Sequence, residues 1–417
     1  MSVLIKNVLL NDQILDVHIE KNRFKRITQN IEIPADTVIN GHSFAILPAF
    51  YNTHTHAAMS LMRAYADDIE LFSWLNDHIW PLEKKLNEDD VYHGSRLAVL
   101  EMIKSGTVYF NDMYWYPMGT ARAAAEMGIR ADIAPVIIDP GLNKKSEVLQ
   151  RCNDDVFIHE NEFPARVRFV LGPHAIYTDS KATLRDCADF ARDQGKRIQI
   201  HISETATEVE NCLKSHGMRP VEYLDSFGFW GPNVLAVHAV HLNQHERDIL
   251  KANNVSISHC PASNMKLCSG DFQYRKAVDT GLHLTLGTDG ASSNNNLSIP
   301  EEMKLAALWA KSISGDPTTA SAAEIFQAAT RNGAGWAQLN AGKIEEGMLA
   351  DCLLVRRHHH TLAPSEHLIS NLVYSADNEC IDTVICDGNI LMQNRVVKNE
   401  EEIIRTAEST YLDLIKR

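Results

Sequence analysis

The sequence predicts an α/β fold: a (β/α)8 TIM barrel accompanied by a small β-sandwich that both ends of the chain build together. Three observations favour it. The chain has 417 residues, which is enough for one large barrel plus a smaller unit. Eight short apolar runs alternate with amphipathic segments between Phe44 and Asn296. The two flanking regions instead contain short segments in which polar and apolar residues alternate.

The eight apolar runs have the length and composition of parallel strands that are buried on both faces. An open doubly wound sheet would need a glycine-rich phosphate loop after its first strand, and NTHTHAAM (52–59) is not such a loop. Eight runs match the strand count of a closed barrel. They are FAILPAFYNTHTH (44–56), GTVYFNDMY (106–114), RADIAPVII (130–138), RVRFVLGPHAIY (166–177), RIQIHISE (197–204), VLAVHAVHL (234–242), VSISHCPASN (255–264) and HLTLGTDGASS (283–293).

The flanking regions predict the second unit. Segments such as VLIKNVLL (3–10) and DTVICDGNILMQ (382–393) alternate as half-buried strands do. GKIEEGMLADCLLV (342–355) combines turn residues with a strand. We therefore predict a barrel over residues 48–342 and one β-sandwich composed of residues 1–47 and 343–417.

Composition excludes several classes of partner and location. The formal net charge of −14 and the pI of about 5.7 argue against binding to a nucleic-acid backbone. No stretch approaches the roughly 18–20 apolar residues of a membrane helix, and the charged N-terminal segment does not read as a signal peptide. The eight cysteines are scattered without a C-x-x-C pair, which favours reduced thiols in a cytoplasmic protein.

Histidines and carboxylates collect where the predicted strands end. Side chains two residues apart in a strand point to the same side, so His54 and His56 leave the first strand together. Neutral imidazole is the commonest metal ligand, and barrel active sites lie at the C-terminal strand ends. A buried His is more often a hydrogen-bonded core residue, and a strand-end Asp is often a helix cap. Because all of these residues lie at the C-terminal ends of strands, a metal site is favoured over separate core or capping roles. The residues are His54, His56, His174, His201, Glu204, His238 and Asp289.

With these motifs in place, the sequence resembles the amidohydrolase superfamily over nearly the whole chain. Its strand-end pattern of H-x-H, two further His and an Asp is that superfamily's pattern. HISE (201–204), SHCPASNMKL (258–267) and LGTDGASSNNNLSI (286–299) resemble the deaminase and chlorohydrolase branch. Within that branch they are similar to the methylthioadenosine/S-adenosylhomocysteine deaminases. The resemblance implies an enzyme that hydrolyses C–N bonds of cyclic amidines, and it makes a homodimer or homotetramer possible.

The resemblance also implies the metal site. Binuclear members of the superfamily bridge their metals with a modified Lys at the end of strand 4, where this chain has His174. We therefore expect one divalent ion bound by His54, His56, His201 and Asp289. Imidazole and carboxylate ligands suit Zn²⁺ well, and Fe²⁺ or Mn²⁺ would also fit.

Roles for the remaining residues follow from the same resemblance. Asp289 is expected to accept a proton from the attacking water, and His238 to hydrogen-bond the reacting centre. Glu204 is expected to shuttle protons between a substrate ring nitrogen and the leaving ammonia. Residues 67–83 (DDIELFSWLNDHIWPLE) are predicted to form a helix that packs on the barrel, because their apolar side chains recur at helical spacing. Glu83, at the end of this segment, is expected to bind the ribose hydroxyls, and His174 the purine ring.

The substrate expectation takes account of one departure from the family. Members that accept S-adenosylhomocysteine carry an Arg in the third strand, where this chain reads Ala134-Pro135-Val136. Lys144 or Lys145 could substitute from the following loop. A nucleoside with a small 5′ group (methylthioadenosine, 5′-deoxyadenosine or adenosine) is therefore expected more than S-adenosylhomocysteine.

Three alternatives stay open at this point. Two are enzymes of the same branch: a deaminase of a free aminated base such as guanine, and a chlorohydrolase of halogenated triazines. Some chlorohydrolases lack the strand 5 Glu or an intact metal set, whereas this chain keeps both. The third is a non-catalytic scaffold, a class that typically loses metal ligands; none is missing here.

Overall fold

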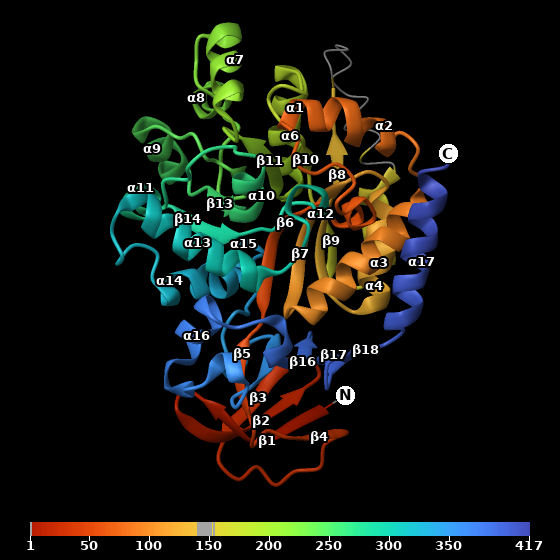
Figure 1. Ribbon diagram of the computed structural model, residues 1–417, viewed down its shortest axis with the longest axis vertical. Helices are drawn as coiled ribbons and strands as arrows, with labels where there is room; N and C mark the ends of the chain where they lie inside the picture. Colours follow the sequence, from red (N-terminus) through yellow and green to blue (C-terminus); the bar gives the residue numbers. More distant parts are fainter. Residues whose placement is uncertain (1, 140–151, 153–154) are drawn as a thin grey trace.

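The computed structural model describes residues 2–139, 152 and 155–417. Its centre is a barrel of parallel strands, and the predicted fold class is confirmed (Figure 1). All eight predicted runs supply barrel strands. These are β6 (Phe50–Thr55), β7 (Thr107–Tyr114), β8 (Arg130–Ile137), β9 (Val167–Phe169) with β10 (Gly172–Pro173), β11 (Ile198–Ile202), β12 (Val234–His238), β13 (Ser256–His259) and β14 (His283–Leu286).

Two parallel sheets join to close the barrel. One contains β6, β7, β8, β9 and β10, and the other runs from β11 to β14. Bridges from Leu171 to Ile198 and from Ala175 to His201 connect β10 with β11. At the other seam, the backbone N–H groups of Thr288 and Asp289 both donate to the carbonyl of His54 at 3.1 Å. The last strand therefore ends directly beside the first.

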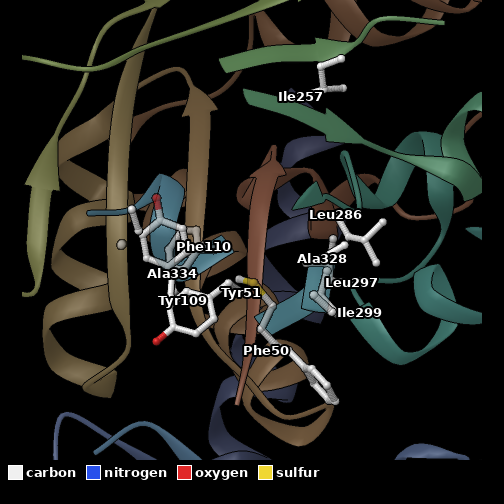
Figure 2. Close-up of a cluster of buried hydrophobic side chains, with 14 of the residues drawn as sticks. Phe50, Tyr51, Tyr109, Phe110, Ile257, Leu286, Leu297, Ile299, Ala328 and Ala334 are labelled. Carbon is white, nitrogen blue, oxygen red and sulfur yellow. The ribbon is translucent and has the colours of Figure 1, made fainter. Parts of the chain in front are cut away.

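Large apolar side chains fill the space between the strands and the surrounding helices (Figure 2). Phe50, Tyr51, Tyr109 and Phe110 are all fully buried, and the rings of Tyr51 and Tyr109 lie 5.6 Å apart. Gly333 must be glycine at this point, because a Cβ there would lie 2.5 Å from the Cβ of Tyr51. Tight packing of this kind holds the strand ends in register.

Helices surround the barrel on its outer face. Several begin at side-chain caps that the sequence supplies, such as Asn87 before α3 and Asn243 before α9. None of the helices in the described part of the chain is long and apolar enough to cross a membrane. Among the described residues between β7 and the end of the barrel, the α-helices are α4 (Pro117–Met127), α6 (Lys181–Gln194), α7 (Ala206–His216), α8 (Pro220–Asp225), α9 (Gln244–Ala252), α10 (Pro261–Lys266), α11 (Tyr274–Thr280), α12 (Ala291–Asn294), α13 (Ile299–Ser314), α14 (Ala322–Gln327) and α15 (Gly333–Trp336).

Between β6 and α3 (Glu88–Lys104), the predicted helix of residues 67–83 is interrupted. It forms α1 (Leu71–Ser73), a π-helical turn (Trp74–Ile79) and α2 (Trp80–Glu83). The N–H of Trp80 donates to the carbonyl of Leu75, five residues earlier, and Pro81 has no N–H with which to continue an α-helical ladder. Because of this wide turn, the side chains of the segment do not follow regular helical spacing.

Both ends of the chain contribute to one sheet beneath the barrel, where red and blue strands lie together in Figure 1. Its N-terminal strands are β1 (Ser2–Leu10), β2 (Gln13–Glu20), β3 (Arg23–Thr28), β4 (Thr37–Asn40) and β5 (Phe44–Pro48). Its C-terminal strands are β15 (Cys352–Arg356), β16 (Ile381–Cys386), β17 (Asn389–Gln393) and β18 (Val396–Val397). The two sets meet where β5 pairs antiparallel with β15.

The exact division at residues 47 and 343 stays a prediction. Two helices follow β15: α16 (Leu368–Tyr374) and α17 (Glu400–Leu414). Helix α17 belongs to the segment predicted for the β-sandwich, yet it packs against the barrel helix α3, and Arg96 of α3 pairs with Glu402 of α17 at 2.7 Å.

A buried ion pair joins the barrel to the end sheet. Arg130 at the start of β8 contacts Asp351 at 2.8 Å and Asp387 at 2.7 Å. The Tyr51 hydroxyl donates to the same Asp351 carboxylate at 2.9 Å. Asp351 is fully buried, and its carboxylate also accepts from the backbone N–H of Asp387 at 2.7 Å.

Replacing Asp351 by Ala should therefore destabilise the protein by about 3–5 kcal/mol, because it leaves the buried Arg130 guanidinium short of a counter-charge. Urea denaturation of the purified variant measures this loss. Asp279→Ala is the control, because Asp279 forms only an exposed pair with Arg275, and such pairs contribute about 0–1 kcal/mol. Equal stabilities of the two variants would contradict the prediction.

Candidate active site

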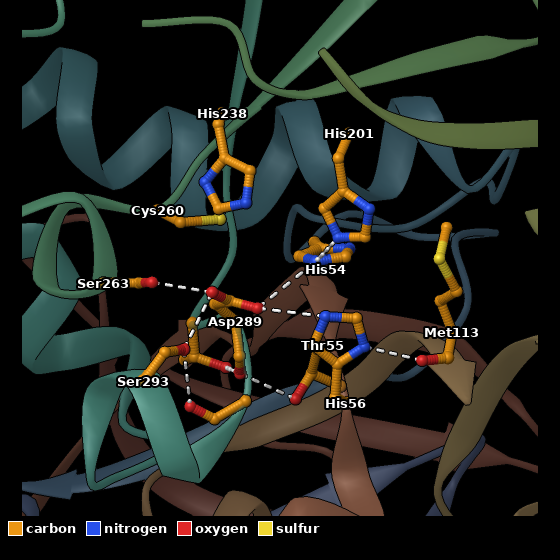
Figure 3. A network of polar contacts seen from close by, with 12 residues as sticks. His54, Thr55, His56, Met113, His201, His238, Cys260, Ser263, Asp289 and Ser293 are labelled. Atoms are coloured by element: carbon orange, nitrogen blue, oxygen red, sulfur yellow. Dashed lines mark hydrogen bonds and ion pairs between the residues drawn. The ribbon is translucent and has the colours of Figure 1, made fainter. Parts of the chain in front are cut away.

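The seven strand-end residues predicted from the sequence all meet at the C-terminal end of the barrel. Figure 3 shows His54, His56, His201, His238 and Asp289 pointing toward one another. Above them lies a cavity. Its lining includes His56, His174, His201, Glu204, His238 and Asp289, and also Glu83. His54 is fully buried among the other rings.

Three histidines present the same ring nitrogen to one point. The Nδ1 atom of each ring is engaged by an oxygen acceptor, so Nδ1 carries the proton and Nε2 keeps its lone pair. The three contacts are His54 Nδ1 to Gln199 Oε1 at 2.9 Å, His56 Nδ1 to the Met113 carbonyl at 2.6 Å, and His201 Nδ1 to the His174 carbonyl at 2.8 Å.

These nitrogens and one carboxylate oxygen fit a metal ion. The Nε2 atoms of His54 and His201 lie 3.2 Å apart, although both are lone-pair acceptors. Oδ1 of Asp289 lies 3.5 Å from His54 Nε2 and 3.2 Å from His56 Nε2. Acceptors gathered this closely in a buried site need a shared cation, and imidazole with carboxylate is a donor set that divalent metals accept. The residues present therefore fit the expected ion.

The protonation states of three of the four donors suit metal binding. Burial lowers the pKa of His54 to about 4, and burial together with the neighbouring histidines lowers the pKa of His201 well below its usual range. The histidines overcome burial and hold the pKa of Asp289 well below its usual range. Burial opposes ionisation of His56 as well, but the Asp289 carboxylate raises the pKa of His56 to about 9. Neutral imidazoles and an ionised carboxylate are the metal-binding forms, so His56 must give up its extra proton when a cation binds.

Asp289 is held in a fixed orientation. Its Oδ2 accepts hydrogen bonds from the hydroxyls of Ser263 at 2.6 Å and Ser293 at 2.8 Å, as the dashed lines in Figure 3 indicate. This leaves Oδ1 to face the histidines. Asp289 adopts a left-handed backbone (φ 61°), and so do Ser203 (φ 50°) and His238 (φ 66°). Such strain at non-glycine residues clusters at functional sites.

Glu204 and His238 lie side by side at the edge of this cluster. His238 donates through Nδ1 to Asn264 Oδ1 at 2.8 Å. One oxygen of Glu204 (Oε1) accepts from the Ser269 hydroxyl at 3.2 Å, and the other (Oε2) lies 4.0 Å from His238 Nε2. Both side chains are nearly completely buried and line the cavity.

The cavity lining also contains aromatic side chains and a further carboxylate. Glu83 at the end of α2 accepts from the indole N–H of Trp115 at 3.0 Å, and burial raises the pKa of Glu83. Trp80 lines the cavity, whereas the ring of Phe72 packs near Tyr177, 6.3 Å away, and is absent from the cavity lining. The cavity is also lined by leucines and a second indole from the same segment. Their helical spacing had predicted that they pack in the core.

His174 lines the cavity next to His201, with the two ring centroids 4.8 Å apart. Its Nδ1 contacts the Thr178 hydroxyl at 3.0 Å, and burial lowers its pKa to about 3, so the ring is neutral. Neither Lys144 nor Lys145 can be placed beside the cavity, because both lie outside the described residues.

Several supporting residues escaped the sequence analysis. Gln199 had a usable signal: it precedes His201 by two residues in an otherwise apolar strand, so both must point to the same side. Its amide also donates to Asn111 Oδ1 at 3.1 Å and to the Asp112 carbonyl at 2.7 Å, which fixes the orientation of the oxygen that faces His54. Others carried no periodic signal, because they lie in short helices or loops beyond the strands; they are Ser263, Asn264, Ser269, Ser293 and Trp115.

Comparison with known proteins decides the family. The profile described as "Amidohydrolase family" matches residues 45–391, most of the chain. The chain belongs to the amidohydrolase family. The predicted family and the prediction of a metal-dependent hydrolase are thus confirmed.

Relatives of this amidohydrolase extend over nearly its full length. It is 45% identical to 5-methylthioadenosine/S-adenosylhomocysteine deaminase 1 of Archaeoglobus fulgidus, over 90% of this chain and 89% of the relative. It is 41% identical to the 5′-deoxyadenosine deaminase of Methanocaldococcus jannaschii, over 98% and 99% of the two chains. The crystal structure of an adenosine deaminase from Xanthomonas campestris with bound zinc superposes with a TM-score of 0.93 at 27% identity, covering 100% of this chain and 98% of that one. The histidine cluster and this neighbour support a divalent metal in the site.

Proposed function

We propose that this amidohydrolase removes the amino group of adenosine-type nucleosides by hydrolysis, with one zinc ion held by His54, His56, His201 and Asp289. One observation carries the proposal. A single cavity is lined by three of the four expected metal donors, by Glu204 and by the buried Glu83. The relatives at 41–45% identity are named for adenosine-type substrates, which supports the same proposal.

The metal donors and Asp289 serve the attack of water. When bound, a divalent cation supplies Lewis-acid chemistry that lowers the pKa of a water toward about 7. Asp289 Oδ1 is positioned to accept the proton of that water, because Oδ2 is already occupied by two serine hydroxyls. His238 offers Nε2 to the reacting centre, because its Nδ1 is engaged by Asn264.

Glu204 moves protons on the substrate side. Its Oε2 faces the cavity next to His238, within reach of a ring nitrogen of a bound purine. A proton delivered there makes the adjacent ring carbon electrophilic. Glu204 is then a carboxylate, which takes up the second proton of the added water and passes it to the departing ammonia, so that one residue serves both transfers.

In this proposal, two further cavity residues orient the nucleoside. The neutral ring of His174, beside His201, contacts the purine ring. Glu83 accepts hydrogen bonds from the two ribose hydroxyls, since a carboxylate can take both at once. Trp115 holds that carboxylate by its indole N–H.

The 5′ group of the substrate is expected to be small and uncharged. Val136 and Ile138 line the cavity near the position at which an Arg was expected for a homocysteine carboxylate. None of the cavity-lining residues that the structure describes is Arg or Lys. Methylthioadenosine, 5′-deoxyadenosine and adenosine therefore fit better than S-adenosylhomocysteine, whose carboxylate would find no Arg or Lys partner among the described lining residues.

Ammonia release by the zinc-loaded protein tests the proposal. The substrates to compare are methylthioadenosine, 5′-deoxyadenosine, adenosine, S-adenosylhomocysteine, guanine and a chlorotriazine. We expect turnover of the adenosines with small 5′ groups, and a lower kcat/KM for S-adenosylhomocysteine. Activity confined to guanine, or chloride release from the triazine, would overturn the nucleoside assignment.

Replacing Glu83 by Gln should raise KM for 5′-deoxyadenosine about 10-fold, because one charge-assisted hydrogen bond to the ribose becomes a weaker one. A dideoxy analogue of adenosine that lacks both the 2′ and the 3′ hydroxyl should show an unchanged KM, because it has no group for Glu83 to bind. Glu88→Gln, at a half-exposed carboxylate five residues later, is the control. An equal rise in KM for both nucleosides would exclude a ribose contact.

A further inference from the structure

One short segment contacts each of the three acid-base groups of the site. We call residues 263–270, at the end of α10 and just beyond it, the positioning segment. It overlaps the motif SHCPASNMKL, to which the proposed chemistry assigns no role of its own. Its contacts are Ser263 Oγ to Asp289 Oδ2 at 2.6 Å, Asn264 Oδ1 to His238 Nδ1 at 2.8 Å, and Ser269 Oγ to Glu204 Oε1 at 3.2 Å.

The contact between Ser269 and Glu204 determines which carboxylate oxygen is available. The Ser269 hydroxyl donates to Oε1, and Oε2 is left beside His238 and the cavity. Ser269 is only 5% exposed and Glu204 only 7% exposed, so water has little access to compete for this hydrogen bond. A carboxylate restrained at one oxygen keeps the other aimed at the substrate position.

Ser269 is itself held rigidly. Its backbone N–H donates to the carbonyl of Asn264 at 2.9 Å, and its carbonyl accepts from His241 Nε2 at 2.5 Å. The next residue, Gly270, has φ +130°, and a Cβ at that position would lie 2.6 Å from His241 Nε2. The chain can therefore make this turn only with glycine, and the turn fixes where the Ser269 hydroxyl lies.

The backbone of Glu204 is fixed from a different direction. The buried carboxylate of Glu208 accepts from the N–H groups of Ser203 at 2.9 Å and Glu204 at 2.8 Å. These bonds hold the main chain but leave the torsions of the Glu204 side chain free. The Ser269 hydroxyl is the group that restrains the carboxylate itself.

We propose that Ser269 is a positioning residue that orients the Glu204 carboxylate for proton transfer. The role rests on the proposed function, because it presupposes that Glu204 carries protons. Through Ser269, the positioning segment affects the rate of the chemical step, although Ser269 is absent from the cavity lining.

The kinetic test replaces Ser269 by Ala in the full-length, zinc-loaded protein. We expect kcat for 5′-deoxyadenosine to fall about 10- to 100-fold, the value of one hydrogen bond to a charged group, while KM changes little. Ser256→Ala is the matched control. It removes another buried serine hydroxyl, which is hydrogen-bonded to His283 at 2.8 Å. Ser256 is the first residue of β13, at the end of the strand away from the active site. An unchanged kcat in Ser269→Ala would overturn the proposal.

Crystal structures of the wild type and of Ser269→Ala supply a readout that needs no activity. We expect the Glu204 carboxylate to rotate or to become disordered in the variant, with Ser203 and Glu208 unmoved. A Glu204 side chain that keeps its orientation would overturn the positioning role even if kcat falls. Absence of nucleoside deamination by the wild type would instead refute the proposed function, and the crystal structures would still decide whether Ser269 orients Glu204.

Discussion

Replacing Glu204 by Gln should lower kcat for nucleoside deamination by about 10²–10⁴-fold, the usual contribution of a general acid-base group. An amide of the same shape keeps the contact with Ser269 but cannot deliver a proton to the ring nitrogen or to ammonia. Steady-state ammonia release measures the effect. Zinc content should stay the same, because Glu204 Oε2 lies beside His238, 4.0 Å from its Nε2, and outside the set of expected metal donors.

Glu210→Gln is the matched control, since it makes the same change on α7 at a carboxylate that is 66% exposed and pairs only weakly with Lys214. It should leave kcat unchanged. A Glu204→Gln variant with wild-type kcat would show that another group carries the proton. A variant that loses zinc along with activity would show instead that Glu204 supports the metal.

Replacing His201 by Ala should abolish both metal binding and activity. The change removes one of three converging Nε2 atoms and leaves His54, His56 and Asp289 as an incomplete donor set. Elemental analysis of the purified protein should fall from one zinc per chain to a small fraction. The melting temperature of the wild type should drop on chelation, because an ion that binds only the folded state stabilises it.

The control for this experiment is His245→Ala, which removes an exposed histidine on α9, far along the chain from the ligands. It should retain one zinc per chain and full activity. Stoichiometric zinc in His201→Ala would exclude His201 as a ligand. Two zinc ions per wild-type chain would contradict the single-ion site.

Strand number and the identity of the strand-end residues were predictable because they depend on local pattern. Eight apolar runs were each long enough for one buried strand, and all eight became barrel strands. The period of two placed His54 and His56 on one side, where both reach the cavity end of the barrel. Helical spacing was less reliable for residues 67–83, because Pro81 and the π-helical turn change which side chains face inward.

The sequence by itself determined the fold class, the family and the set of side chains available for chemistry, because strand periodicity and barrel geometry send every C-terminal strand end to the same place. Tertiary structure alone decided how those side chains meet. The Nε2 atoms of His54 and His201 lie 3.2 Å apart although the two residues are 147 positions apart in the sequence. Ser269 contacts Glu204, which is 65 positions away in the sequence. Such contacts depend on the packing of distant loops against one another, and no local pattern encodes a distance between two segments that only the closed barrel brings together.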